Sequence, residues 1–287
     1  MQDQNELNAL IKLLDDPDIN IYRDIENRIL SFGITAREYL KEASLEAANQ
    51  TRRLRLEKLI SLLNFEFIKN ELKSWKNSKE KDLLTGMNLI AEYQYPDLNT
   101  NEIRHKIEAI RKDAWLELNN NLTALEQVKI LNHVFFDIHG FKANKQDFYA
   151  PENSYINDLL LFKKGNPISL SALYSIIAQS LDIPIYGVNL PEHFILAYVD
   201  SPVYDLAETD DILFYINVFN NGVVFTKNEI NQFLRKVKLT PENSYFLPCS
   251  NNVILQRMLN NLIFSYSKTN KHQKVKDLEI LIKVLQI

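Results

Sequence analysis

The chain has 287 residues, of which 46% are hydrophobic and 24% charged, with a net charge of −4, six glycines and nine prolines. This composition is that of a globular protein with a sizeable core, and it argues against long flexible linkers and against an all-β fold with many turns. Basic and acidic residues are intermixed, so the basic stripe that marks a nucleic-acid-binding surface is not expected.

The chain starts with a polar and acidic segment, MQDQNELNALIKLLDD, which lacks the basic beginning and the long apolar run of a secretion signal. No apolar run approaches the roughly 18 residues that suggest a membrane span. A cytoplasmic protein is therefore expected, with neither nucleic acid nor a membrane as its partner. The oligomeric state is left open by the sequence.

Residues 1–146 are predicted to form one helix after another, because apolar residues recur there at spacings of three and four. The first apolar face consists of Leu7, Leu10, Ile11, Leu13 and Leu14. The second apolar face consists of Ile19, Ile21, Ile25, Ile29 and Leu30, and the helix that carries it is predicted to end with Gly33 as its C-cap. Further helices are predicted over residues 51–75, 82–94, 100–118 and 123–140.

Residues 147–240 change character and mix helices with strands. A helix ending at Gly165 is followed by a second helix over 167–181. Runs of β-branched and aromatic residues then predict strands over 183–190, 193–200 and 212–219. Thr226 and Glu229 have the spacing of a capping box, which predicts that a further helix begins there.

The tail, residues 241–287, is predicted to form two antiparallel helices with a turn at Thr269–Lys271. Helices thus precede and follow a single cluster of strands, which predicts a mostly helical α+β fold. It divides into a helical N-terminal region (1–146), a core with a small antiparallel sheet (147–240) and a C-terminal helical hairpin. Whether residues 1–146 fold on their own is left open.

The helix over 167–181 has a well-defined beginning. Asn166 is a good N-cap, and Pro167 is favoured at the first helical position, where an N–H group has no helical partner. Such a helix start lowers the pKa of a cysteine placed there, and its free N–H groups can receive an oxyanion. A histidine at the beginning of a neighbouring strand, here His193, can then approach such a nucleophile.

The stretch from about 147 to 222 resembles the papain-like core of the transglutaminase-like superfamily. Gly165–Pro167 match the family's G-x-C motif, Ser171 its small residue and Leu173 its leucine. Leu181–Pro184 match the end of the family's helix, and His193 matches its histidine. More closely, NSYINDLLLFKKGNPISLSALY, GVNLPEHFILAY and INVFNNG are similar to the bacterial SirB-type branch. That resemblance implies helices before the core and a tetratricopeptide-like tail, here QRMLNNLIFSY.

Two positions depart from the family's pattern. Pro167 stands where the resemblance places the catalytic cysteine, and Asn217 where it places the aspartate that orients the histidine. Asparagine can orient a histidine, as in Cys-His-Asn triads, but proline cannot act as a nucleophile. The resemblance therefore implies a non-catalytic, regulatory protein without a cofactor, whose cleft and helical flanks bind a peptide or another protein.

Two alternatives remain open. In the first, the protein is a hydrolase or acyltransferase in which His193 activates Ser169 or a nucleophile of the substrate. Two helical positions correspond to a rotation of about 200°, so Ser169 and Pro167 face different directions, and a first-turn serine that bonds nearby backbone is the simpler interpretation. In the second, the protein is a scaffold whose cleft is filled by Tyr174 or Phe194.

Neighbouring residues are assigned structural roles. Ser171 and Ser175 are small residues that let a strand pack closely against the helix, and Glu192 is expected to be exposed. His193 is either a base or ligand-binding group, or a core histidine held by Asn217.

The single cysteine, Cys249, excludes an intramolecular disulfide. It precedes a helix capped by Ser250 or Asn251, and an inert, partly buried thiol is expected there. No metal site is expected, because the six-residue spacing of His133 and His139 puts them on different helix faces, and no suitable partners accompany His105 or His272. One aromatic cluster is interpreted as core, with a groove as the alternative: Phe135, Phe136, Phe141, Phe148, Tyr149 and Tyr155.

Overall fold

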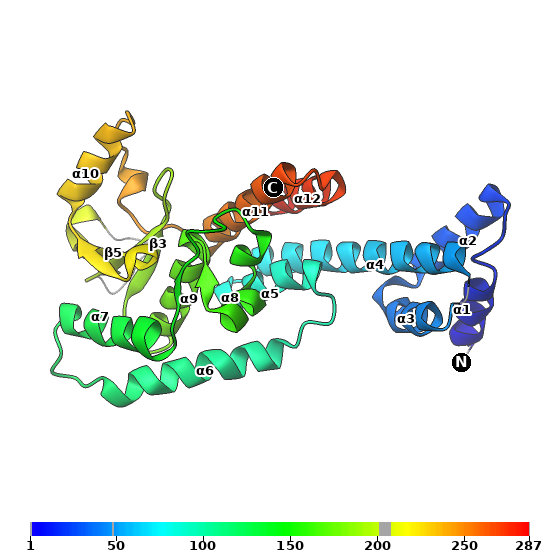
Figure 1. Cartoon of the computed structure of the whole chain (residues 1–287), viewed down its shortest axis with the longest axis horizontal. Coiled ribbons are helices and arrows are strands. Elements are labelled where there is room, and N and C mark those ends of the chain that lie inside the picture. The colour runs from blue at the N-terminus through cyan, green and yellow to red at the C-terminus, as the bar shows by residue number, and fades with distance from the viewer. Residues whose placement is uncertain (1, 48, 201–207, 287) are drawn as a thin grey trace. The chain divides into compact units, whose positions relative to one another are not determined.

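The computed structural model describes residues 2–47, 49–200 and 208–286 (Figure 1). The chain divides into two compact units, Met1–Ser74 and Trp75–Ile287. The described residues contain twelve α-helices and one four-stranded antiparallel sheet, which confirms the mostly helical α+β fold. Among these helices, none has the combined length and apolar character that crossing a membrane requires. The division at residues 146 and 240 stays a prediction.

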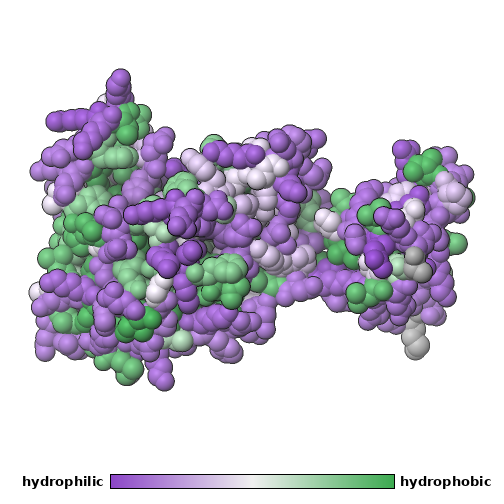
Figure 2. Space-filling view, viewed as in Figure 1, coloured by the Kyte–Doolittle hydropathy of each residue, from purple (hydrophilic) through white to green (hydrophobic). Residues whose placement is uncertain are grey.

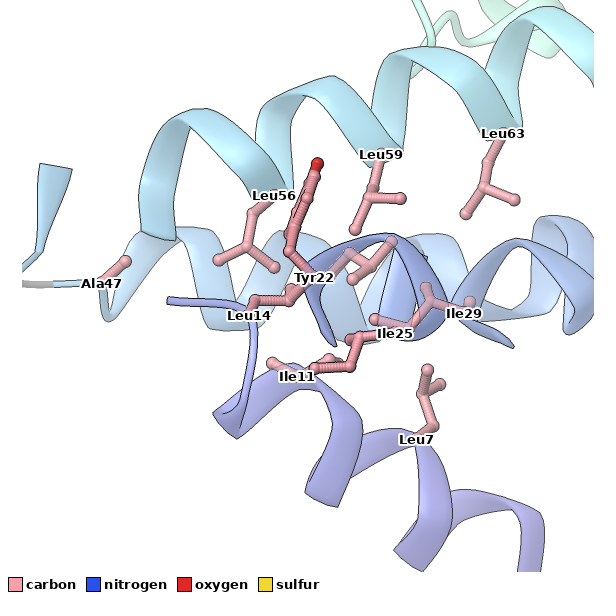
Figure 3. Packing of buried hydrophobic residues seen from close by; sticks show 12 residues of the cluster. Leu7, Ile11, Leu14, Tyr22, Ile25, Ile29, Ala47, Leu56, Leu59 and Leu63 are labelled. Atoms are coloured by element: carbon pink, nitrogen blue, oxygen red, sulfur yellow. The ribbon is translucent and has the colours of Figure 1, made fainter. Parts of the chain in front are cut away.

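The first unit consists of helices whose apolar residues meet in one core. Its helices are α1 (Gln2–Lys12), α2 (Ile19–Ser31), α3 (Arg37–Leu45) and most of α4 (Gln50–Asn77). Figure 3 shows Leu7 of α1, Ile25 of α2 and Leu59 of α4 pointing toward one another. Helix α3 was not predicted from the sequence.

The apolar face predicted for α2 is partly wrong. Ile19 and Ile21 are 52% and 45% exposed, and the buried stripe is instead formed by Tyr22, Ile25 and Ile29. The reason is the helix start: the Asp18 side chain caps the helix by accepting the N–H of Asn20, so Ile19 and Ile21 lie in an exposed first turn. Leu13, 52% exposed, lies beyond the end of α1 in a turn.

The second unit opens with helices that the sequence predicted, with one difference. They are α5 (Leu83–Gln94), α6 (Thr100–Glu117) and α7 (Ala124–Asn132). The helix predicted over 123–140 leaves α-helical geometry at His133 and continues as a π-helical segment to Ile138. Two short parallel strands, β1 (Lys142–Ala143) and β2 (Lys164–Gly165), then flank α8 (Ile156–Phe162).

The antiparallel sheet has the strand order β3-β4-β5-β6. Its strands are β3 (Ile185–Val188), β4 (Ile195–Val199), β5 (Ile212–Asn217) and β6 (Val223–Phe225). The last strand was not predicted. His193 was expected to begin a strand, but β4 starts only at Ile195, so His193 lies in the preceding loop, where its backbone N–H donates to the Leu190 carbonyl.

Helices cover both faces of the sheet. One face packs Ala197 against Ile230 and Leu234 of α10 (Lys227–Lys236). The other faces α9 (Pro167–Gln179) and α7, where the Tyr198 hydroxyl donates to Gln127 at 2.7 Å. Because every residue of β4 is buried, this strand is the centre of the core. The predicted capping box of α10 is present, with Glu229 accepting the Thr226 N–H at 2.8 Å.

The C-terminal hairpin consists of α11 (Asn251–Lys268) and α12 (His272–Gln286), as predicted. Asn252, at the start of α11, donates to the Leu285 carbonyl at the end of α12 at 3.0 Å, so the two helices are antiparallel. The hairpin is fixed to the rest of the unit by a buried contact between the Tyr155 and Tyr266 hydroxyls at 2.9 Å. On the face shown in Figure 2, hydrophilic residues dominate and hydrophobic ones form separate patches.

Candidate functional site

The first turn of α9 is held by a reciprocal pair of hydrogen bonds. The Asn166 side chain accepts the Ser169 N–H at 2.9 Å, and the Ser169 hydroxyl accepts the Asn166 N–H at 3.1 Å. Pro167 occupies the first helical position. Gly165 precedes it because a Cβ there would lie 2.6 Å from the Ser169 hydroxyl and 2.9 Å from Leu159. The local sequence therefore fixes where Pro167 lies.

Ser169 is completely buried beneath this turn. Its hydroxyl donates to the Asn153 carbonyl at 2.5 Å while it accepts the Asn166 N–H. It does not line the cleft in which His193 lies. This is the arrangement of a first-turn serine that satisfies backbone groups.

A cleft of about 480 Å³ opens at the beginning of α9. Pro167 and His193 both line it. Asn217 does not line the cleft but forms a side-chain hydrogen bond with His193, so the structure brings together all three positions that the resemblance indicated. Helix α11 contributes Arg257 and Phe264 to the same cleft, and Glu192 lies beside His193. Because Glu192 is exposed, as expected, its carboxylate can reach solvent.

His193 is partly buried beside polar and charged neighbours. Its burial lowers the pKa of the imidazole below the usual 6.5, and the nearby charge of Arg257 lowers it further. A side-chain hydrogen bond with Asn217 at the end of β5 acts in the opposite direction. His193 is therefore neutral at pH 7, and Asn217 fixes the orientation of its ring.

Arg257 also lines the cleft, but it was not predicted as a site residue from the sequence. Burial lowers the pKa of its guanidinium, and the charge of Glu192 partly offsets this effect. The guanidinium donates a hydrogen bond to a neutral acceptor, the side-chain oxygen of Asn189, at 3.3 Å. The available signal was periodicity, because Arg257, Asn261 and Phe264 recur at i, i+4 and i+7 on one face of α11.

The predicted aromatic cluster divides into two parts. Phe135, Phe141 and Tyr155 are buried, and the first two rings stack with centroids 4.4 Å apart, as expected for core. Phe148 and Tyr149 are 41% and 47% exposed and line the cleft, so their assignment to the core was wrong.

The position of Phe148 and Tyr149 has a local cause. The buried Asn153 side chain donates to the carbonyls of Asp147 and Phe148, at 2.7 and 3.1 Å, and thereby holds this turn beside the start of α9. The Tyr149 ring lies 5.0 Å from the Phe264 ring, centroid to centroid. We call Phe148, Tyr149 and Phe264 the aromatic wall of the cleft.

The alternative of a filled cleft does not fit this geometry. Tyr174 is buried away from the cleft, and its hydroxyl donates to Asn132 at 3.0 Å. Phe194 does line the cleft, but only as part of its wall, and a cavity remains beside His193.

Other candidate groups lie elsewhere. Burial raises the pKa of the Cys249 thiol to about 12, so it stays protonated at neutral pH. Ser250 occupies the N-cap position of the helix that follows, and its side chain makes no capping hydrogen bond. His133 pairs with Asp137 at 3.1 Å, whereas His139 pairs with Asp113 at 2.9 Å. Within the described ranges, no cluster of three or more histidine, cysteine or acidic side chains could hold a metal ion.

Comparison with known proteins identifies the superfamily to which the chain is similar. The family model described as transglutaminase-like superfamily matches residues 101–260, more than half of the chain. A protein of Xylella fastidiosa (strain 9a5c) named UPF0162 protein is 29% identical over 195 residues, which is 66% of each chain. The UPF0162 protein YchA of Escherichia coli K12 is 25% identical over 215 residues, 74% of this chain and 72% of that protein.

A eukaryotic relative matches over a shorter region. Human F-box only protein 21 is 32% identical over 133 residues, 46% of this chain but 20% of the human protein. The chain therefore matches just under two thirds of the first Xylella protein and one fifth of the human one. No solved structure matches the chain.

Proposed function

The chain belongs to the transglutaminase-like superfamily, and we propose that it is a non-catalytic, SirB-type member whose cleft binds a peptide segment of a partner protein. Its role is regulatory, and the cytoplasm is its expected location. The observation that carries the proposal is Pro167 at the first position of α9, lining an open cleft with His193. The side chain at that position has no nucleophilic atom.

The serine hydroxyls in the cleft and beneath it do not replace a nucleophile. Ser265 lines the cleft, but its hydroxyl donates to the Asn261 carbonyl at 2.9 Å within α11. Ser169, the displaced nucleophile of the enzymatic alternative, is buried beneath the helix start with its hydroxyl bonded to backbone. These contacts support binding over acyl transfer.

The size and lining of the cleft suit a short peptide. A volume of about 480 Å³ lies within the range of sites that hold a small molecule or a few side chains. Exposed aromatic rings, an arginine and neutral polar groups line it together, a combination typical of residues that anchor partners at interfaces.

The proposal is tested by selecting linear peptides from a random displayed library on the full chain. Asn261→Trp places a bulky ring in the cleft, whereas Asn260→Trp places the same ring on an exposed position of α11 outside it. We expect Asn261→Trp to lower the affinity for the selected peptides by about tenfold or more, a loss of about 1.4 kcal/mol in binding free energy. Asn260→Trp should leave the affinity unchanged. Failure to select any peptide sensitive to Asn261→Trp would overturn the binding role.

The non-catalytic part has its own test. Hydrolysis and amine transfer are measured on glutamine peptides and acyl esters with the wild type and His193→Ala. No turnover above the variant is expected. Turnover that disappears in His193→Ala would show that the protein is an enzyme.

A further inference from the structure

The charge of Arg257 is incompletely compensated. Arg257 is partly buried, and its guanidinium donates a hydrogen bond to the neutral amide of Asn189. No carboxylate among the described residues forms an ion pair with it, although Glu192 is near enough to influence its ionisation. A desolvated cation without a bonded anion is unfavourable, and a carboxylate that reaches its planar fork relieves that cost.

The surroundings of Arg257 offer little competition for such a carboxylate. Glu192 is the single acidic side chain that lines the described cleft, and it is exposed to solvent. The other titratable group facing Arg257 is His193, which burial keeps neutral at pH 7. The start of α9, the positive end of the helix dipole, borders the same cleft.

Another part of the cleft is lined by aromatic rings. Phe148, Tyr149 and Phe264 are 41%, 47% and 48% exposed, which is unusual for a cluster of three large rings. The Lys268 ammonium lies 3.4 Å from the Tyr149 ring centroid and supports the wall from one side. The aromatic wall can therefore receive an apolar side chain of a ligand.

The distance between these two features sets the spacing in the ligand. Arg257 and Phe264 are seven residues apart on α11, an axial separation of about 10 Å at 1.5 Å per residue. An extended peptide covers that distance in about three residues, at about 3.3 Å each.

We propose that Arg257 is the anchor for a carboxylate of the bound peptide, and that an apolar or aromatic side chain about three residues away rests on the aromatic wall. The inference rests on the proposed peptide-binding function and specifies its ligand. The carboxylate comes from an Asp or Glu side chain or from the C-terminus of the peptide, since both present the same two oxygens to the guanidinium.

The experiment uses an array of synthetic, N-acetylated hexapeptides probed with the full-length protein. Glu and Phe are placed at every mutual spacing, in both orders, with amidated C-termini. Each peptide has a partner with Gln in place of Glu. A second set carries Phe at each distance from a free C-terminal carboxylate, with amidated partners. Preference in the first or the second set identifies the source of the carboxylate.

We expect binding to be strongest at a spacing of about three residues and to weaken by about tenfold when the carboxylate is removed. Arg257→Gln should abolish this preference, and Arg257→Lys should restore only part of it, because the ammonium lacks the planar fork. Glu192→Gln should strengthen the binding of acidic peptides, since it removes a carboxylate that competes for Arg257. Lys276→Gln makes the same charge change as Arg257→Gln on exposed α12 and should have no effect.

The outcomes separate the inference from the function on which it rests. Peptides that bind in the cleft, as judged by Asn261→Trp, but without preference for a carboxylate would overturn the inference alone. So would a preference that survives in Arg257→Gln. Should Arg257→Gln fail to fold, two measurements still test the inference. They are the difference in wild-type binding between Glu peptides and their Gln partners, and the effect of Glu192→Gln on the binding of acidic peptides. Absence of any peptide binding sensitive to Asn261→Trp would overturn the binding function itself.

Discussion

At the scale of single residues, the side chain at position 167 determines whether the cleft contains a nucleophile. Pro167 lines the cleft with His193 at the start of α9, so Pro167→Cys should produce a thiol with a lowered pKa. We expect iodoacetamide to alkylate it at pH 7 about tenfold faster than the same thiol in the denatured chain. Mass spectrometry distinguishes it from Cys249, which is partly buried and whose raised pKa keeps its thiol protonated, so that it should react far more slowly in the folded protein.

The control for this prediction is the double variant Pro167→Cys with His193→Ala. It keeps the helix start but removes the imidazole, so its alkylation should be slower than that of Pro167→Cys. Equal rates in the two variants, and in the denatured chain, would mean that position 167 does not face His193 as a nucleophile would.

Two serines on α9 provide a second prediction. Ser169 and Ser171 are both completely buried, but the Ser169 hydroxyl bonds Asn153 and Asn166, whereas that of Ser171 has no partner within the described part of the chain. Ser169→Ala should lower the free energy of unfolding by about 1–3 kcal/mol. Ser171→Ala should leave it unchanged or raise it slightly, since it removes an unsatisfied polar group.

Urea unfolding of the two variants beside the wild type measures this difference. Equal losses from both substitutions would contradict the hydrogen-bonding role given to Ser169.

His193 predicts how stability depends on pH. Burial lowers its pKa below 6.5 in the folded protein, Arg257 lowers it further, and Asn217 partly opposes them. The unfolded state then binds the proton more readily, so this contribution is complete above pH 6.5 and is lost as the pH falls through the folded pKa. The unfolding free energy of the wild type, relative to His193→Gln, should fall between about pH 7.5 and pH 5.

Carboxylates that titrate in the same pH range contribute equally to the unfolding free energies of the wild type and His193→Gln, so their contribution cancels in the difference. Glu192, the nearest acidic neighbour in the cleft, is present in both proteins. A difference that stays constant with pH, or grows in acid, would contradict a buried neutral His193.

At the scale of secondary structure, the sequence predicts elements best where local chemistry decides. Asn166 and Thr226 were identified as helix beginnings from their own neighbours, and both caps are present. Strand β6 has only three residues, too few for an alternating pattern to be recognised. The loop position of His193 depends on where β4 pairs with its neighbours, a long-range property that local composition does not contain.

The cleft was predictable in part. Pro167, His193 and Asn217 were found because a motif carries them within some 50 residues. Arg257 and Phe264 lie on a helix that composition alone marks as part of a hairpin, and only its packing against α9 brings them to the cleft. Phe148 and Tyr149 were assigned to the core because aromatic content alone does not distinguish a buried ring from a cleft wall.

The attachment of the hairpin gives a prediction at this scale. The Tyr266 hydroxyl bonds the buried Tyr155 hydroxyl and the Gln94 side chain, at 2.9 and 3.1 Å. Tyr266→Phe leaves the Tyr155 hydroxyl without that partner and should cost about 1–2 kcal/mol in urea unfolding. Tyr149→Phe, at an exposed ring, is the control and should cost little. A neutral Tyr266→Phe would show that this network does not hold the hairpin.

At the scale of the whole molecule, the cleft depends on segments that the sequence assigned to different parts. The three-part division separates the core at residue 240 from the hairpin, yet Arg257 and Phe264 of α11 line the same cleft as Pro167 and His193. The family match ends at residue 260, inside α11. The hairpin is thus part of the site, and all of its residues lie in the unit Trp75–Ile287.

This arrangement predicts that residues 75–287 fold and bind without the first unit. Both tryptophans of the chain, Trp75 and Trp115, belong to the second unit, so their fluorescence reports on that unit alone. Trp75 is buried and donates its indole N–H to the Asp82 carbonyl at 2.6 Å, which ties this end of α4 to the start of α5. The fluorescence-detected urea midpoint should therefore be the same in the fragment and in the full chain.

Circular dichroism supplies the complementary measurement, because helices of both units contribute to it. In the full chain its transition should include a component that is absent from the fragment and from the tryptophan signal, since two independent cores unfold separately. Peptides selected on the full chain should bind the fragment with unchanged affinity. A fragment that is unfolded, or folded but unable to bind these peptides, would show that the first unit completes the structure on which the cleft depends.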